Sequence, residues 1–323
     1  MTWSKHASDA LQAQLENMIA EAVLAERFGI EAPPAAILAG HKSALQDLLY
    51  RSIPLAKVMD GSDLVLHAEG PSVQADAPKL SAVNWVAGTA ERTIRKLSGS
   101  LFDLLERDSK RLSRKLDLRM TGMASGSLYM GFAIGEFPTL CGLWDDEPVI
   151  DRIREAVRQL PVVTEAIDDR GAAENLGEIV PDPAERDATM SALHSLAPTG
   201  KRGIHTLDMS SPGNRPSSLS QRERILLADA LRHPKLLNKH HGRFTGEVRE
   251  IDLDARRIHL RGTASGGSLR CVLPELTRDQ AKLFLGEQVQ VSGEYETNKQ
   301  GRPRLILVDE IRPVPRLTQL DAF

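Results

Sequence analysis

The sequence predicts an α+β multidomain protein: an N-terminal helical and α/β region with a β-hairpin, a mostly helical middle and a C-terminal five-stranded OB-like β-barrel. Three observations predict it. Apolar residues recur at helical spacing in residues 8–55, a hairpin pattern occupies 116–134, and residues 240–313 contain strand, turn and helix patterns in a barrel-like order. A chain of 323 residues is long enough for two or three domains.

The barrel is predicted from the order of its elements, which is three strands, one short helix and two strands. An OB-type barrel has this order and binds oligonucleotides or oligosaccharides on the face of its second and third strands. An SH3-like barrel is the alternative, but a helix between strands three and four fits it less well. The expected strands are 243–252, 257–262, 268–273, 288–295 and 304–311, with the helix at 276–285.

Basic residues gather on one expected face of this barrel. Arg257, His259 and Arg261 alternate with Ile258 and Leu260, so they share the outer face of strand two. An ordinary solvated face is the alternative interpretation. Strands two and three contain no Phe, Tyr or Trp for base stacking, so binding there would be electrostatic and salt-sensitive. The candidate nucleic-acid-binding residues are Arg257, His259, Arg261, Arg270, Lys299, Arg302 and Arg304.

Charge is distributed unevenly along the chain, although the net charge is only −3. Residues 1–200 contain 20 Lys and Arg against 29 Asp and Glu, a net charge of −9. Residues 201–323 contain 21 against 15, a net charge of +6. A basic carboxyl-terminal third predicts either an anionic partner or contact with the acidic part of the same chain.

The sequence predicts four regions. They are an N-terminal helical pair in 1–60, an α/β region in 61–147, a mostly helical region in 148–235 and the barrel in 236–323. In the second region a strand at 63–68, a long helix at 80–116 and the hairpin at 116–134 predict a sheet of about three strands covered by the helix. The pattern of Ser220 and Glu223 predicts a capping box at the start of a helix over 221–232.

Familiar catalytic and phosphate-binding motifs are absent from the sequence, including the nucleophile elbow, the Walker A loop and paired Cys-x-x-Cys. No catalytic residue, metal ligand or cofactor is therefore predicted, and the two cysteines are expected to be free thiols in a reducing compartment. Without a signal peptide or a long apolar run, a cytoplasmic location is expected. The acidic runs 145–147 and 168–169 offer oxygen ligands for a magnesium ion, although such loops are usually solvated.

These features favour a non-enzymatic bacterial binding protein that contacts nucleic acid or another anionic partner through the basic face of the barrel, while the front of the chain mediates assembly with a protein partner or a second copy. Two alternatives stay open. One is a protein–protein adaptor or regulator in a bacterial defence or toxin–partner system. The other is a metal-dependent hydrolase that uses the loop carboxylates. No membrane partner is expected.

Overall fold

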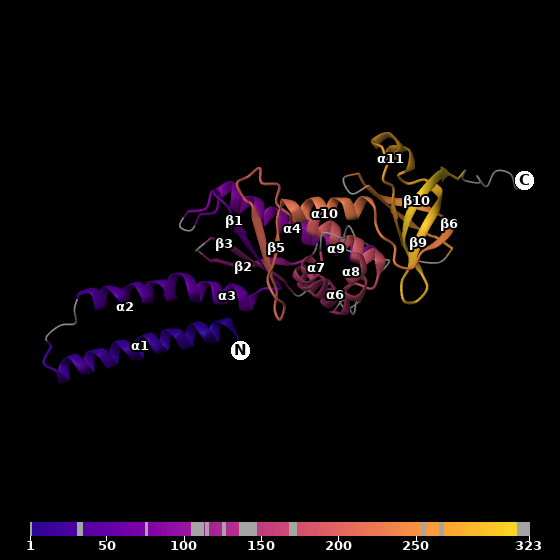
Figure 1. Cartoon of the computed structure of the whole chain (residues 1–323). Helices are drawn as coiled ribbons and strands as arrows, with labels where there is room; N and C mark the ends of the chain where they lie inside the picture. Colours follow the sequence, from indigo (N-terminus) through magenta and orange to yellow (C-terminus); the bar gives the residue numbers. More distant parts are fainter. Residues whose placement is uncertain are drawn as a thin grey trace, which may run out of the picture.

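The computed structural model contains a projecting helical hairpin, a central α/β body and a terminal barrel, arranged in a line (Figure 1). The predicted α+β class is confirmed, with a closed five-stranded barrel at the carboxyl end and a separate sheet in the body. The structure describes residues 2–30, 35–74, 77–104, 113, 116–124, 127–135, 147–167, 173–253, 256–264 and 268–314.

The N-terminal helices form an antiparallel hairpin that extends away from the body (Figure 1). Few side chains are fully buried where α1 meets α2: among the described residues of these two helices, Ala7 is the one that is buried. The backbone N–H groups of Trp3 and Ser4 donate to the carboxylate of Asp60, at 2.9 and 2.7 Å, which ties the start of α1 to the body. The elements are α1 (Trp3–Arg27), α2 (Ala35–Asp47), the π-helical turn η1 (Leu48–Ser52) and α3 (Ile53–Gly61).

The body contains an antiparallel five-stranded sheet in the order β2-β3-β1-β4-β5. The hairpin predicted at 116–134 is present, but the expected sheet of about three strands is too small. The polar segment after residue 205 contributes two more strands, because β4 pairs with the open edge of β1. The strands are β1 (Leu64–Glu69), β2 (Leu118–Ala124), β3 (Leu128–Ile134), β4 (Thr206–Ser210) and β5 (Ser217–Leu219).

One face of the sheet packs on the helices, and α3 covers part of the other. Leu64, Leu66 and Ala68 of β1 point into a core shared with α4 and α9. On the opposite face α3 lies close to β2 and β3, and a side chain at Gly131 would collide with Ser62. The helices of the body are α4 (Leu80–Leu104), α6 (Glu147–Arg158), α7 (Leu160–Glu165), α8 (Ala173–Ile179), α9 (Pro183–Leu196) and α10 (Gln221–Arg232).

Local capping signals fix where two of these helices begin. Asp182 accepts from the backbone N–H groups of Ala184 and Glu185, so the first turn of α9 is capped and Pro183 occupies its first position. The capping box predicted at Ser220 and Glu223 is confirmed at the start of α10. Both helices therefore have their starts encoded locally.

The barrel closes in the order β10-β8-β7-β6-β9, with β8 and β10 parallel and the other pairs antiparallel. Ile258 and Leu260 point into its core, as their alternation predicted. Cys271 lies there as a buried free thiol whose pKa is raised by burial. The elements are β6 (His240–Asp252), β7 (Arg257–Arg261), β8 (Leu269–Val272), α11 (Arg278–Phe284), β9 (Gln288–Thr297) and β10 (Pro303–Pro313).

None of the described helices combines the length and apolar character needed to cross a bilayer.

Candidate functional site

The face of the barrel that carries the predicted cations packs against α9. Arg257 is 1% exposed, and its Nη2 and Nε lie 2.6 and 3.0 Å from the two carboxylate oxygens of Asp187. Arg270, which is 3% exposed, donates from Nε to the same carboxylate. The expectation that these two side chains face solvent is wrong. They point outward from the barrel, but an acidic residue of the protein's own helix occupies the space in front of them.

Two further ion pairs extend this contact along the start of α9. The Nε of Arg304 lies 3.1 Å from Oδ2 of Asp182, so its expected exposure is also wrong. In the second pair the cation belongs to the helix and the anion to the barrel: Nη2 of Arg186 in α9 lies 2.7 Å from Oε2 of Glu296 in β9. The interface therefore contains charges of both signs contributed by each side, which specifies how the barrel sits on the helix.

The Asp187 carboxylate is buried together with both of its guanidinium partners. Burial by itself raises the pKa of a carboxyl group, but here Arg257 and Arg270 hold the pKa of Asp187 well below its ordinary value. Because the folded-state pKa is depressed, the stability that this pair contributes is present above the unfolded pKa near ~4 and is lost as the pH falls through the lower folded value.

The remaining candidate residues are dispersed around the barrel. His259 is buried, with Nδ1 3.5 Å from Oε2 of Glu250, so its expected exposure is also wrong. Arg261 is half-buried. Lys299 and Arg302 lie exposed at the turn between β9 and β10. The structure thus brings Arg257 and Arg270 together around one carboxylate, whereas Lys299 and Arg302 remain accessible elsewhere.

The proposed magnesium ligands cannot be compared with the structure in the same way. Asp145, Asp146, Asp168 and Asp169 lie outside the described residues, as does the side chain of Glu147. Metal binding by these loops stays a prediction.

A different group of cations lines a surface cavity of about 330 Å³ between α4 and the ends of α9 and α10. Within the described part of the chain, neither Arg92 nor Arg224 forms an ion pair, and Lys96 pairs with Asp252 of the barrel at 2.5 Å. Arg224 donates to the backbone carbonyl oxygens of His194 and Ala197. The lining comprises Trp85, Thr89, Arg92, Thr93, Lys96, Ser195, Ala197, Thr199 and Arg224.

The positive charge around this cavity affects a nearby histidine. The pKa of His194 is lowered to about 4, first by burial and then by the positive charges of Arg224, Lys96 and Arg232. Partial burial also lowers the pKa of Arg224, although a guanidinium stays protonated at neutral pH. The local potential therefore disfavours a further cation and favours an anion.

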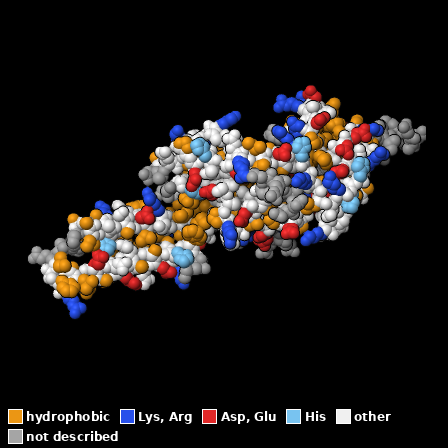
Figure 2. All heavy atoms as spheres, viewed as in Figure 1, with side chains coloured by type: hydrophobic (Ala, Val, Ile, Leu, Met, Phe, Trp, Pro, Cys, Tyr) orange, Lys and Arg blue, Asp and Glu red, His pale blue; other side chains and the backbone are white. Residues whose placement is uncertain are grey.

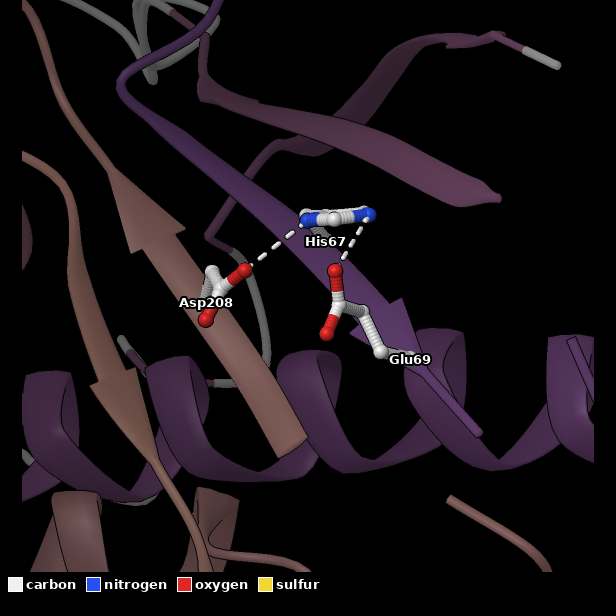
Figure 3. A group of neighbouring side chains, drawn as sticks. All are labelled: His67, Glu69 and Asp208. Atoms are coloured by element: carbon white, nitrogen blue, oxygen red, sulfur yellow. Dashed lines mark hydrogen bonds and ion pairs between the residues drawn. The ribbon is translucent and has the colours of Figure 1, made fainter. Parts of the chain in front are cut away.

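A third group of polar side chains lies on the face of the sheet partly covered by α3. His67 lies between two carboxylates, with Nδ1 2.9 Å from Oδ2 of Asp208 and Nε2 3.8 Å from Oε1 of Glu69 (Figure 3). The ligand atoms of these three residues lie within 4.8 Å of one another. Imidazole and carboxylate are ligand types for divalent metals, but one imidazole and two carboxylates also form ordinary hydrogen-bonded networks.

Neither the cavity nor the histidine cluster was predicted from the sequence. Arg92 and Lys96 occur in a helix with ordinary charge, and Arg224 belongs to a separate helix 128 residues further on. His67 is separated from its partner Asp208 by 141 residues. The available signal was weak: His67 is a polar interruption in the mainly apolar strand β1, whereas Asp208 is one of several polar residues in β4.

The sequence matches no known protein-family model and no curated protein.

Proposed function

We propose that this protein binds nucleotide phosphates, either along a nucleic-acid strand or in a free nucleotide, at the cavity between α4, α9 and α10. The observation that carries the proposal is the combination of Arg92, Lys96 and Arg224 around one cavity, two of them without an ion pair in the described residues. This keeps the predicted class of partner, an anion, and moves its contact from the barrel face to the body.

The chemistry of the lining suits such a ligand. Guanidinium and ammonium groups bind phosphate oxygens through charge-assisted hydrogen bonds. The hydroxyl groups of Thr89 and Thr93 add neutral donors, and the indole of Trp85 offers an aromatic face for a base. A cavity of about 330 Å³ lies within the range of small-ligand sites.

We infer that the barrel is of the OB type, and the parallel pairing of its third and fifth strands together with its closed order supports this inference. In OB-type barrels the second and third strands form the usual ligand face. Here that face carries Arg257 and Arg270, both engaged by Asp187. In this proposal the barrel is held against the body, and its exposed Lys299 and Arg302 form a secondary contact with a longer strand.

The test is fluorescence anisotropy with labelled 12-nucleotide single-stranded DNA and RNA, and calorimetry with ATP. Reversing two lining charges, Arg92→Glu with Lys96→Glu, should weaken binding at least tenfold. Arg222→Glu is the matched control, because Arg222 is an exposed arginine of α10 that does not line the cavity. For a strand with about three phosphate contacts, log K should fall with log salt with a slope near −2.

The arms of this experiment separate the possible outcomes. Binding of the strand but not of ATP would identify nucleic acid as the partner, and tight binding of ATP alone would identify a free nucleotide. If Lys299→Glu with Arg302→Glu abolishes binding while the cavity variant retains it, the site lies on the barrel and the cavity proposal is wrong. If the parent protein binds neither the labelled strands nor ATP, the cavity proposal is also wrong.

We further propose that the N-terminal hairpin joins two copies of this chain. Its seam is partly polar: His41 bridges Gln14 at 2.8 Å and Glu21 at 2.7 Å beside the half-buried Leu11, Met18 and Leu45. Other large apolar side chains remain outside (Figure 2). Ile19 is 64% exposed and Val23 is 57% exposed. A two-helix hairpin buries little on its own, whereas two hairpins form a four-helix bundle.

Charge favours a second copy as the occupant of this surface. Helix α1 contains four acidic and two basic residues, whereas α2 with η1 contains two basic and one acidic. A two-fold axis would place the α1 of one copy against the α2 of the other. Light scattering should report a dimer for the parent and a monomer for Ile19→Asp with Val23→Asp. A parent that is monomeric at micromolar concentration would exclude this assembly.

A further inference from the structure

A row of polar side chains crosses the sheet of the body on one face. The register pairs Tyr129 of β3 with His67 of β1, His67 with Asp208 of β4, and Asp208 with Ser218 of β5. Residues that are directly paired point to the same face of a sheet, so these four side chains lie side by side. Ser127, which immediately precedes β3, adds its hydroxyl to the row.

The hydrogen bonds of this row have a defined direction. Asp208 is held ionised, because hydrogen bonds from His67 and Ser218 lower its pKa even though burial raises it. An ionised carboxylate accepts hydrogen bonds and donates none, so Nδ1 of His67 carries the proton. In a neutral imidazole the other nitrogen is then an acceptor, and Nε2 receives the hydrogen bond donated by the hydroxyl of Ser127.

The aromatic neighbour completes the arrangement. The ring of Tyr129 stacks on the imidazole of His67 with centroids 4.0 Å apart and planes within 4° of parallel. Burial raises the pKa of the Tyr129 phenol. The row therefore runs as a chain of donors from Ser127 through His67 to Asp208, with the Tyr129 ring packed on the imidazole.

We propose that Ser127, His67 and Asp208 form a nucleophilic site that hydrolyses carboxylic esters, with Ser127 as nucleophile, His67 as general base and acid, and Asp208 as the group that positions His67. The same order of roles, from hydroxyl to imidazole to carboxylate, operates on several unrelated folds and is recognised by geometry rather than by sequence motif. Ser127, His67 and Asp208 are each partly exposed, so an ester can reach the hydroxyl from solvent.

The reaction proceeds in two balanced steps. Oγ of Ser127 adds to the ester carbonyl carbon while its proton moves to Nε2 of His67. The bond to the alkoxy group then breaks, and the alcohol leaves with the proton from His67. Water adds to the acyl-Ser127 group through the same histidine, the acyl–oxygen bond breaks, and the carboxylic acid and free Ser127 result.

The charge around the site restricts the substrate. Glu69 places a largely exposed carboxylate 3.8 Å from Nε2 of His67, with Asp208 on its other nitrogen (Figure 3). These two negative charges stabilise the imidazolium that forms during the reaction and repel an anionic ester. Neutral and cationic esters are therefore the expected substrates. This site is independent of the phosphate-binding cavity, so either proposal can fail without the other.

The test uses a fluorophosphonate, which phosphonylates an activated serine hydroxyl and releases fluoride. Intact-protein and peptide mass spectrometry should locate one adduct at Ser127 of the full-length protein, and p-nitrophenyl acetate should be hydrolysed. Ser127→Ala should abolish both signals, whereas Ser43→Ala, at an exposed serine of α2 outside this row, is the matched control and should retain them. Asp208→Asn should slow labelling about 100-fold or more and alter its pH profile, as expected of a positioning residue.

The proposal is overturned by no adduct on the folded parent, by an adduct at another residue, or by Ser127→Ala with unchanged esterase activity. Circular dichroism of each variant shows whether it is folded, and the labelling site on the parent tests the proposal even if a variant is unfolded. Loss of parent labelling in EDTA would also contradict it, because that result assigns His67, Glu69 and Asp208 to a metal ion.

Discussion

The contact between the barrel and α9 and the cavity on α4 and α10 contain similar arginines with different surroundings. At the first, Arg257 and Arg270 are almost fully buried and share the carboxylate of Asp187. At the second, Arg92 and Arg224 line an open cavity with no ion pair in the described residues. Burial makes a charged group require a counter-charge, whereas a solvent-exposed one is stabilised by water until a ligand arrives.

This difference explains why a cluster of arginines in a sequence does not identify a binding face. The acidic front and basic back of the chain allowed two interpretations, an external anion or contact with each other. For Arg257, Arg270 and Arg304 the second applies. The binding site proposed at the cavity draws its cations from helices that precede the barrel.

The largest change in stability is expected at the contact between the barrel and α9, where the charges are buried. Asp187→Ala leaves two guanidinium groups buried without their carboxylate, so the free energy of unfolding should fall by about 3–5 kcal/mol. Urea denaturation followed by circular dichroism measures this change. Asp229→Ala removes an exposed carboxylate of α10 and should change stability by less than about 0.5 kcal/mol. Equal values for the two variants would show that the interface is not coupled to folding.

A smaller, pH-dependent change in stability is expected from His194, which lies near the cavity. The pKa of His194 is about 4 when folded and near 6.5 when unfolded, so the unfolded chain binds the extra proton between these values. The free energy of unfolding should therefore keep the full contribution of neutral His194 above about pH 6.5 and should decrease as the pH falls toward about 4. Denaturation at pH 7 and pH 5 should show that His194→Gln reduces this decrease, whereas His205→Gln, at an exposed position, should not.

The smallest effect is expected for the exposed ion pair between body and barrel. The side chains of Lys96 and Asp252 are 42% and 22% exposed, so Lys96→Ala should lower stability by at most about 1 kcal/mol. The same denaturation assay measures it. A loss as large as that of Asp187→Ala would contradict the distinction between buried and exposed charges.

Much of the fold was predictable because its signals are local. The barrel elements follow from period-two alternation, and α10 from the Ser220 and Glu223 capping box. The sheet was predicted less completely. Strands β4 and β5 lie in a short polar segment, and they are strands because the edge of β1 supplies their backbone hydrogen-bond partners. In β4 the apolar residues Leu207 and Met209 alternate with polar ones, but this alternation does not specify that the segment pairs with β1.

The sequence by itself determined the class, the order of barrel elements, the core positions Ile258 and Leu260, and the side of β7 on which Arg257 lies. The tertiary structure alone decided that this side meets α9, that Arg92 and Arg224 meet at one cavity, and that His67 lies between Ser127 and Asp208. The reason is physical. Periodicity specifies the direction of a side chain relative to its own strand, whereas the group that it meets is set by how distant elements pack.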